Sequence, residues 1–218
     1  MGPPDPPPDG ATPEAAADGP ADPRPRSDAG ADDWPELARR AQELAARWVH
    51  DGRRLDMRGL SAELGVSRVT LFRHVGGREV LLGRALWLLT ERTFAAAERQ
   101  WELGPEGLRS TGVMRLFNQR IAAAPGLRRL LDDEPALAIR VLTDPRGAIQ
   151  PGVVAAVEAL LRRDVQEAGL ELILEPGALA FALVRIGESF LYADVLANRT
   201  PDVDMADRLQ RALIEGRA

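Results

Sequence analysis

From residue 34 onward, apolar residues recur every three or four positions, and no clear stretch alternates with a period of two. This spacing is typical of amphipathic helices and argues against half-buried strands. Prolines and glycines divide the region into about nine expected helices, at residues 34–51, 57–64, 68–74, 78–101, 106–123, 127–142 with an interruption near Pro135, 152–168, 177–197 and 203–215. The sequence therefore predicts an all-α protein.

Residues 1–33 differ in composition from the rest of the chain. The first 30 residues hold nine of the seventeen prolines, and residues 1–33 hold eight acidic residues against two arginines. Such a segment buries too little apolar surface to offset the entropy of ordering it, so we expect a disordered, acidic tail. A solvated extension and an interaction tail both fit this composition.

The chain shows no targeting segment. Its first ten residues carry neither the basic cluster nor the apolar run of a secretory signal. The longest apolar run, residues 178–184, is much shorter than the roughly 18 residues that a membrane helix needs. We therefore expect a cytoplasmic protein that does not contact the membrane.

The chain has no cysteine and only two histidines, His50 and His74. It also lacks the glycine-rich loops that cradle phosphates. These absences argue against disulfide scaffolds, zinc sites and enzymes with a cysteine nucleophile. We expect no metal, no cofactor and no catalytic residues.

Charge is distributed unevenly along the chain. The formal net charge is −5, which taken alone argues against binding to nucleic acid. However, residues 34–84 hold ten arginines and six acidic residues, so this segment carries +4 between two acidic segments of −6 and −3. All 28 basic residues are arginines, whose planar guanidinium groups suit phosphate and guanine, although the codon bias of a GC-rich genome also explains this usage.

The basic segment contains two short expected helices joined by a tight turn at Gly65, which is the signature of a helix-turn-helix. Leu60, Leu64, Val66 and Leu71 are spaced to close a small core between the two helices. The second helix would then expose a face that fits the major groove of DNA, with its N-terminal residues against base edges.

The residues expected on this face suit DNA recognition. Arg68 can form two hydrogen bonds to guanine, and Thr70 can contact a base or a phosphate. Ser67 and the free N–H groups at the start of the second helix can bind a phosphate. With flanking residues included, the predicted DNA-binding set is Arg58, Ser67, Arg68, Val69, Thr70, Phe72, Arg73, His74 and Arg78.

The run LSAELGVSRVTLFRHVGGREVLL, residues 60–82, resembles the DNA-binding domain of the TetR family of transcriptional regulators. In that family the position of Phe72 is usually Tyr, whose hydroxyl contacts a phosphate, and Phe72 loses that contact. The position of Arg78 is usually Lys, and Arg preserves its charge. The resemblance implies a dimeric, ligand-released repressor that binds a palindromic DNA operator, with recognition helices about 34–36 Å apart.

Two C-terminal stretches, residues 134–142 and 184–194, resemble the QsdR-like subgroup of the same family. By analogy this implies a small-molecule effector such as a lactone. The family resemblance further implies a helix-turn-helix DNA-binding domain at 34–78, a ligand-binding and dimerisation domain at 79–218, and a homodimer interface within about 177–215. The apolar stripe that includes Leu179 and Phe190 could instead pack within its own subunit.

The predicted ligand-binding set draws on the C-terminal helices. Arg185 and Glu188 are either a surface ion pair or a polar group in an apolar pocket, with Ser189 and Tyr192 one turn further on. Arg140 either contacts the ligand or extends to solvent. The full set is Met114, Phe117, Asn118, Arg140, Arg185, Glu188, Ser189 and Tyr192.

The main alternative is a small all-α ligand-binding protein or enzyme whose helix-turn-helix is incidental. It would need a convincing cluster of convergent titratable residues outside the motif, and the sequence shows none.

Overall fold

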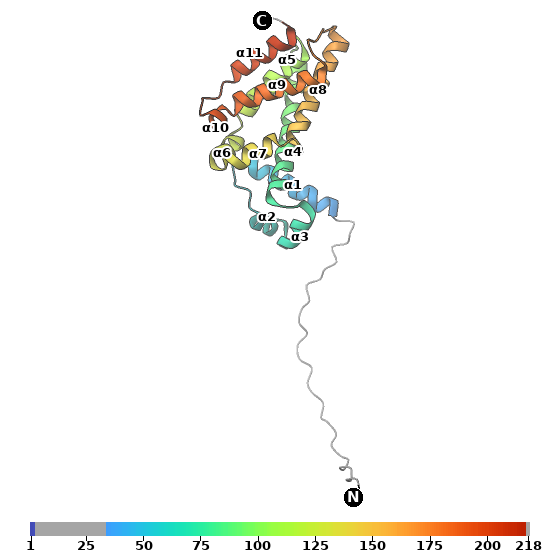
Figure 1. Cartoon of the computed structure of the whole chain (residues 1–218), viewed down its shortest axis with the longest axis vertical. Helices are drawn as coiled ribbons and strands as arrows, with labels where there is room; N and C mark the ends of the chain where they lie inside the picture. The colour runs from blue at the N-terminus through green and yellow to red at the C-terminus, as the bar shows by residue number, and fades with distance from the viewer. Residues whose placement is uncertain (3–33, 217–218) are drawn as a thin grey trace.

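A computed structural model describes residues 1–2 and 34–216, so the predicted disorder of the N-terminal tail falls almost entirely outside the described residues. The described part of the chain contains helices and no strand, as predicted (Figure 1). The helices are α1 (Trp34–His50), α2 (Met57–Leu64), α3 (Arg68–Val75), α4 (Arg78–Leu103), α5 (Arg109–Ala122), α6 (Pro125–Asp133), α7 (Pro135–Thr143), α8 (Ile149–Ala168), α9 (Pro176–Leu191), α10 (Ala193–Ala197) and α11 (Val203–Glu215).

Two expected helices are each divided in the structure. The break expected near Pro135 separates α6 from α7, because Glu134 leaves the helical region (φ −140°, ψ 57°) and Pro135 starts the next helix. The expected helix 177–197 is broken at Tyr192, whose φ of −111° and ψ of 23° separate α9 from α10. These two divisions turn the nine expected helices into eleven within the described residues.

Several prolines begin helices rather than separate them. Pro125, Pro135 and Pro176 each occupy the first turn of their helix, where the missing N–H has no partner to lose. We expected α8 to begin after Pro151, but it begins at Ile149 and takes Pro151 into its first turn for the same reason.

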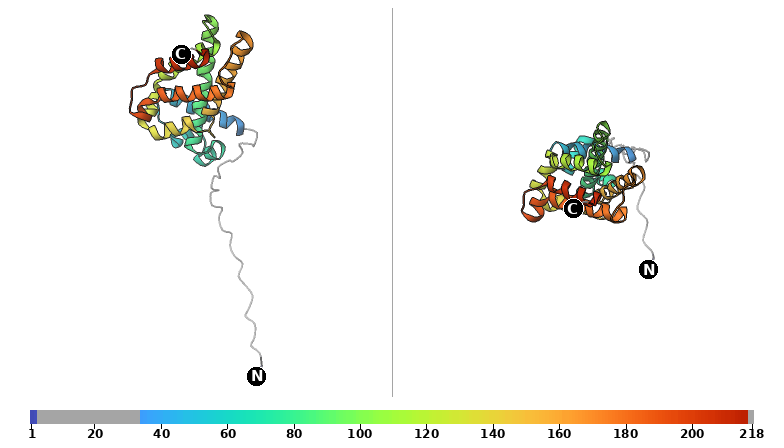
Figure 2. Two further views of the ribbon diagram at one scale, coloured as in Figure 1. Left: turned by 45° about the horizontal axis from the view of Figure 1, so that its top comes forward. Right: turned by 90° about the horizontal axis from the view of Figure 1, so that it is seen from above.

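Helix α4 runs between the two ends of the molecule. Helices α2 and α3 lie at one end, whereas α5, α9 and α11 lie at the other (Figures 1 and 2). The N-terminal half of α4 packs Leu82 and Leu86 into an apolar core with α1, α3 and α7. Its C-terminal half packs Phe94 and Ala97 into a second core with α5, α8, α9 and α11. A single helix therefore contributes to both cores.

None of the helices in residues 34–216 is long and apolar enough to cross a membrane.

Helix α6 packs directly against the last turn of α1. A Cβ atom placed on Gly126 would lie 2.0 Å from the carbonyl oxygen of Val49 and 2.6 Å from that of His50. Only glycine permits this distance, because side-chain-bearing residues never bring Cβ so close to a backbone oxygen. The contact fixes the first turn of α6 against the end of α1.

We predict that Gly126→Ala destabilises the protein by about 2 kcal/mol or more, because the added methyl group must push α6 away from α1. Thermal or urea unfolding monitored by circular dichroism measures this change. The control is Gly104→Ala, whose Cβ would meet nothing within 4 Å at an extended φ of −159°. Equal stability of the two variants would show that the α1–α6 contact is looser than described.

Candidate nucleic-acid interface and adjoining cavity

Local hydrogen bonds define both helices of the helix-turn-helix. The carboxylate of Asp56 caps α2 by accepting from the backbone N–H groups of Gly59 (2.7 Å) and Arg58 (3.2 Å), and these bonds lower the pKa of Asp56. Gly65, with a φ of 71°, ends α2, and the Ser67 hydroxyl caps α3 by accepting from the Thr70 N–H at 3.0 Å. The predicted turn and caps are therefore present.

The apolar residues between α2 and α3 form the expected small core. Leu60 and Leu71 are completely buried, and Leu64 and Val66 pack against them partly exposed. Because Leu71 and Val75 face inward, the opposite face of α3 is turned to solvent. This arrangement leaves a helix surface that no other described element covers.

The predicted DNA-binding residues at and near α3 differ in how far their side chains are exposed to solvent. Ser67, Arg68 and Arg73 are exposed, as are two apolar side chains, Val69 at 67% and Phe72 at 62%. Thr70 and His74 are half-buried. The Thr70 hydroxyl hydrogen-bonds that of Ser67 at 2.8 Å, and Nδ1 of His74 lies 2.8 Å from the Thr70 carbonyl oxygen.

Three arginines of this region form no ion pair, although the charges of Arg58 and Arg68 contribute to lowering the pKa of Asp56. Arg58, Arg68 and Arg73 are exposed and form no ion pair with any residue of the described chain. Many arginines elsewhere are paired, for example Arg92 with Glu43 at 2.8 Å. The α2–α3 surface therefore presents guanidinium groups available to an external anion.

Arg78 has other partners than the DNA phosphate we predicted for it. Its Nε donates to the Leu55 carbonyl oxygen at 2.6 Å, and its two terminal nitrogens donate to the carboxylate of Glu134 at 2.8 and 2.5 Å. These bonds hold the pKa of Glu134 below its usual range. Because Glu134 lies between α6 and α7, Arg78 joins the helix-turn-helix to the C-terminal helices.

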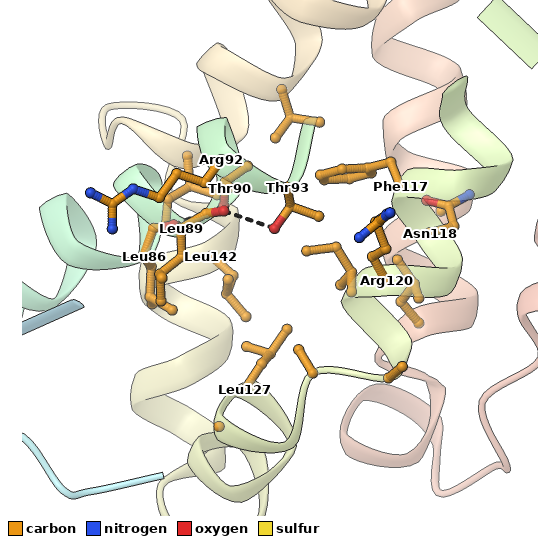
Figure 3. A pocket seen from close by; sticks show the side chains of 18 of the residues that line it. Leu86, Leu89, Thr90, Arg92, Thr93, Phe117, Asn118, Arg120, Leu127 and Leu142 are labelled. Carbon is orange, nitrogen blue, oxygen red and sulfur yellow. Dashed lines mark hydrogen bonds between the residues drawn. The ribbon is translucent and has the colours of Figure 1, made fainter. Parts of the chain in front are cut away.

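A cavity of about 840 Å³ lies beside this junction, within the size range of small-molecule sites. Its walls come from α1, α4, α5, α6, α7, α8, α9 and α11. Leu86 and Leu142 lie on one side of the space and Phe117 on the other (Figure 3). Five of the predicted ligand-binding residues line it: Met114, Phe117, Asn118, Glu188 and Tyr192.

The other three predicted ligand-binding residues are not among those that line the cavity. Arg140 is exposed and donates two hydrogen bonds to Glu79, at 2.6 and 2.8 Å. Arg185 is exposed and pairs with Glu188, while the Ser189 hydroxyl donates to the Arg185 carbonyl oxygen at 2.8 Å. Glu188 therefore contributes to the cavity wall while its partner Arg185 stays at the surface.

Burial raises the pKa of two titratable groups in the cavity wall. Desolvation raises the pKa of Glu188, and the Arg185 guanidinium offsets only part of this effect. Desolvation also raises the pKa of Tyr192, and the charge of Glu188 raises it further. No group of three or more His, Asp or Glu side chains in the described residues could hold a metal ion.

Asn118 was predicted from the sequence to bind ligand, but its buried hydrogen-bond partner Gln210 was not. Gln210 accepts a hydrogen bond from the Asn118 amide at 2.8 Å and donates one to the Leu183 carbonyl oxygen at 2.9 Å, so Gln210 links α5 to α9. One signal could have identified Gln210, because it lies four residues from both Ala206 and Ile214, on the buried face of α11.

The end of α1 also lines the cavity, although no residue of α1 was predicted to bind ligand. Arg47, His50 and Asp51 line it, together with Pro125 and Gly126 of the adjoining α6. The first helix of the helix-turn-helix unit is therefore also part of the cavity wall.

Comparisons with known proteins agree with this architecture. Residues 106–215 match the family model for the tetracyclin repressor-like C-terminal domain. The transcriptional repressor QsdR of R. erythropolis, from the TetR family, is 32% identical, with a TM-score of 0.75 over 84% of this chain and 96% of that one. A search of curated proteins found no match.

Two further solved structures share less with this chain. A putative transcriptional regulator from Pseudomonas aeruginosa is 16% identical, with a TM-score of 0.47 over 84% of this chain and 90% of that one. The TetR family regulator PfmR from Thermus thermophilus is 18% identical, with a TM-score of 0.40 over 80% of this chain and 96% of that one.

The family model spans half of the chain, and the similarity to QsdR extends over most of it. Together these findings confirm the resemblance to the TetR family and to QsdR. The chain belongs to the TetR family of DNA-binding transcriptional regulators.

Proposed function

We propose that this protein is a cytoplasmic, ligand-released repressor that binds a palindromic operator as a homodimer. The observation that carries the proposal is the shared wall of the cavity: α1 belongs to the helix-turn-helix domain, α4 packs against it, and both helices line the cavity. An effector in the cavity therefore touches the same helices that hold α3 in place.

The operator-binding surface in this proposal is the exposed face of α3. Arg68 lies in the first turn of α3, the part of a recognition helix that contacts base edges. Arg73 and Arg58 lie further along the same surface region, where guanidinium groups bind phosphates. Val69 and Phe72 add exposed apolar groups that suit thymine methyls. Arg78 is left out of the proposed contacts, because Glu134 and Leu55 accept from three of its five N–H donors and Glu134 neutralises its charge.

The proposed dimer interface uses α9 and α11, the neighbouring helices within residues 177–215. Leu179 and Leu183 are completely buried, so that part of the α9 stripe packs within its own subunit. A different face of α9 remains exposed and carries Phe181, while α11 exposes Leu209. Exposed large apolar side chains on adjacent helices are suited to a two-fold helical bundle.

The proposed response to the effector follows from linkage between two sites. A dimer fits its operator only when the two α3 helices are separated by about 34–36 Å. An effector that binds better to a conformation with another separation lowers the affinity of the dimer for its operator. By linkage, the operator lowers the affinity for the effector by the same factor. The nature of that effector as a lactone rests on the QsdR resemblance alone.

The alternative of an enzyme or a stand-alone ligand-binding protein is less well supported. The acidic and histidine residues of the cavity wall are divided between its two ends, with His50 and Asp51 exposed and Glu188 buried. Glu188 is already paired with Arg185. This arrangement suits binding better than acid–base chemistry, so we propose regulation without catalysis.

We predict that Arg68→Ala weakens operator binding by about 1–3 kcal/mol and relaxes the sequence preference at one base pair of each half-site. Arg73→Ala should weaken binding to all sequences alike and reduce its salt dependence. Fluorescence anisotropy with an operator recovered by selection from genomic fragments measures both effects.

The matched control for the DNA experiment is Arg146→Ala, since Arg146 is exposed in the loop between α7 and α8. Its affinity and salt dependence should equal those of the wild type. Unchanged affinity of both α3 variants would refute the assignment of α3 as the recognition helix.

We predict that Phe181→Asp converts the dimer to a monomer at micromolar concentration and lowers operator affinity, because a charged group replaces a buried aromatic ring at the interface. Sedimentation equilibrium measures the dissociation constant. Leu103→Asp is the control, since Leu103 is 90% exposed at the end of α4. A dimer of unchanged stability in Phe181→Asp would exclude this face of α9.

A further inference from the structure

The cavity opens to solvent through a mouth whose charged residues come from three helices. We define the mouth as the exposed polar residues that line the cavity: Arg47, His50 and Asp51 at the end of α1, Arg92 of α4 and Arg120 of α5. Three of these five side chains are arginines, and Asp51 is the one carboxylate among them.

The three arginines differ in how their charge is compensated. Arg92 donates to both carboxylate oxygens of Glu43 at 2.8 Å, so its charge is neutralised outside the cavity. Arg120 donates to the neutral amide oxygen of Gln100 at 2.7 Å, and it projects from α5 toward the open space (Figure 3).

Arg47 forms no ion pair with any residue of the described chain, and neither do Arg120 and Asp51. The mouth therefore carries two guanidinium groups and one carboxylate that have no ion-pair partner in the described chain. The net charge of these three side chains is positive, and it attracts an anionic oxygen group.

The interior of the cavity offers a contrasting environment. Leu86, Phe117, Leu142 and Val157 make its walls largely apolar, and the Asn118 and Gln210 amides, joined by one hydrogen bond, carry no charge. The single acidic group in this interior belongs to Glu188, which would repel an anion placed beside it. An anionic ligand group therefore belongs at the mouth, and an apolar ligand group belongs inside.

We infer that the effector is an amphiphile with one anionic head, a carboxylate or a phosphate monoester, and an apolar chain. The head binds between Arg47 and Arg120, and the chain occupies the interior. This inference rests on the proposed function only in calling the ligand an effector. Because Arg47 belongs to α1 and Arg120 to α5, the head connects the helix-turn-helix unit to the C-terminal helices.

The experiment measures direct binding of three probes to the full chain by isothermal titration calorimetry, without DNA. The probes are decanoate, decyl phosphate and δ-decalactone, which have the same number of carbon atoms and differ in charge. The variants are Arg47→Ala, Arg120→Ala and the control Arg99→Ala, an exposed arginine of α4 that lies outside the cavity wall and forms no described ion pair. Circular dichroism confirms that each variant is folded.

We expect at least one of the two anions to bind, and the stronger of them identifies the head group. Arg47→Ala and Arg120→Ala should each weaken its binding about tenfold or more, which corresponds to the loss of one charge-assisted contact. Arg99→Ala should have no effect, and Arg47→Lys should restore part of the affinity.

The inference is overturned if the lactone binds wild-type protein as tightly as the stronger of the two anions, if neither anion binds, or if both alanine variants bind that anion like the wild type. A separate assay measures whether the anion releases the protein from operator DNA. It distinguishes failure of the ligand assignment from failure of the proposed repressor function. An anion that binds through Arg47 and Arg120 but leaves the operator complex intact supports the ligand assignment and contradicts the repressor mechanism.

Discussion

The contact between α1 and α6 is the constraint on which the rest of the arrangement depends. Gly126 allows the first turn of α6 to lie against the carbonyl oxygens of Val49 and His50, with no side chain between the two backbones. The ion pair of Arg78 with Glu134 ties the other end of α6 to the start of α4. With both ends of α6 held, the helix-turn-helix unit and the cavity share a wall instead of being separated by a linker.

Local signals made the helix-turn-helix predictable from the sequence. Asp56, Gly65 and Ser67 each act on residues within a few positions along the chain, so their roles as caps and turn could be inferred without the fold. The same holds for the burial of Leu60 and Leu71, which follows from helical spacing. Family resemblance then supplied the function, which no spacing rule could have given.

Partners distant in sequence were not predictable by the same means. Arg78 and Arg140 were assigned to DNA and ligand because free guanidinium groups suit both, yet each has an acidic partner more than fifty residues away. The cavity itself depends on eight helices meeting, so Arg47 could not be assigned to it from its own surroundings, and for Gln210 the helical spacing indicates burial but not a cavity. Met114, Phe117 and Asn118 reached the cavity wall together because they share one buried face of α5.

The shared use of α1 also bears on how a protein of this design can change its effector. Side chains on α5, α8, α9 and α11 can be exchanged to alter the cavity while the helices that support α3 stay untouched. Arg47, His50 and Asp51 line the cavity at the end of α1, and α1 itself packs against α3. We therefore expect new effector specificities to arise first by substitutions in the C-terminal helices. Substitutions at the end of α1 should occur only together with changes in operator binding.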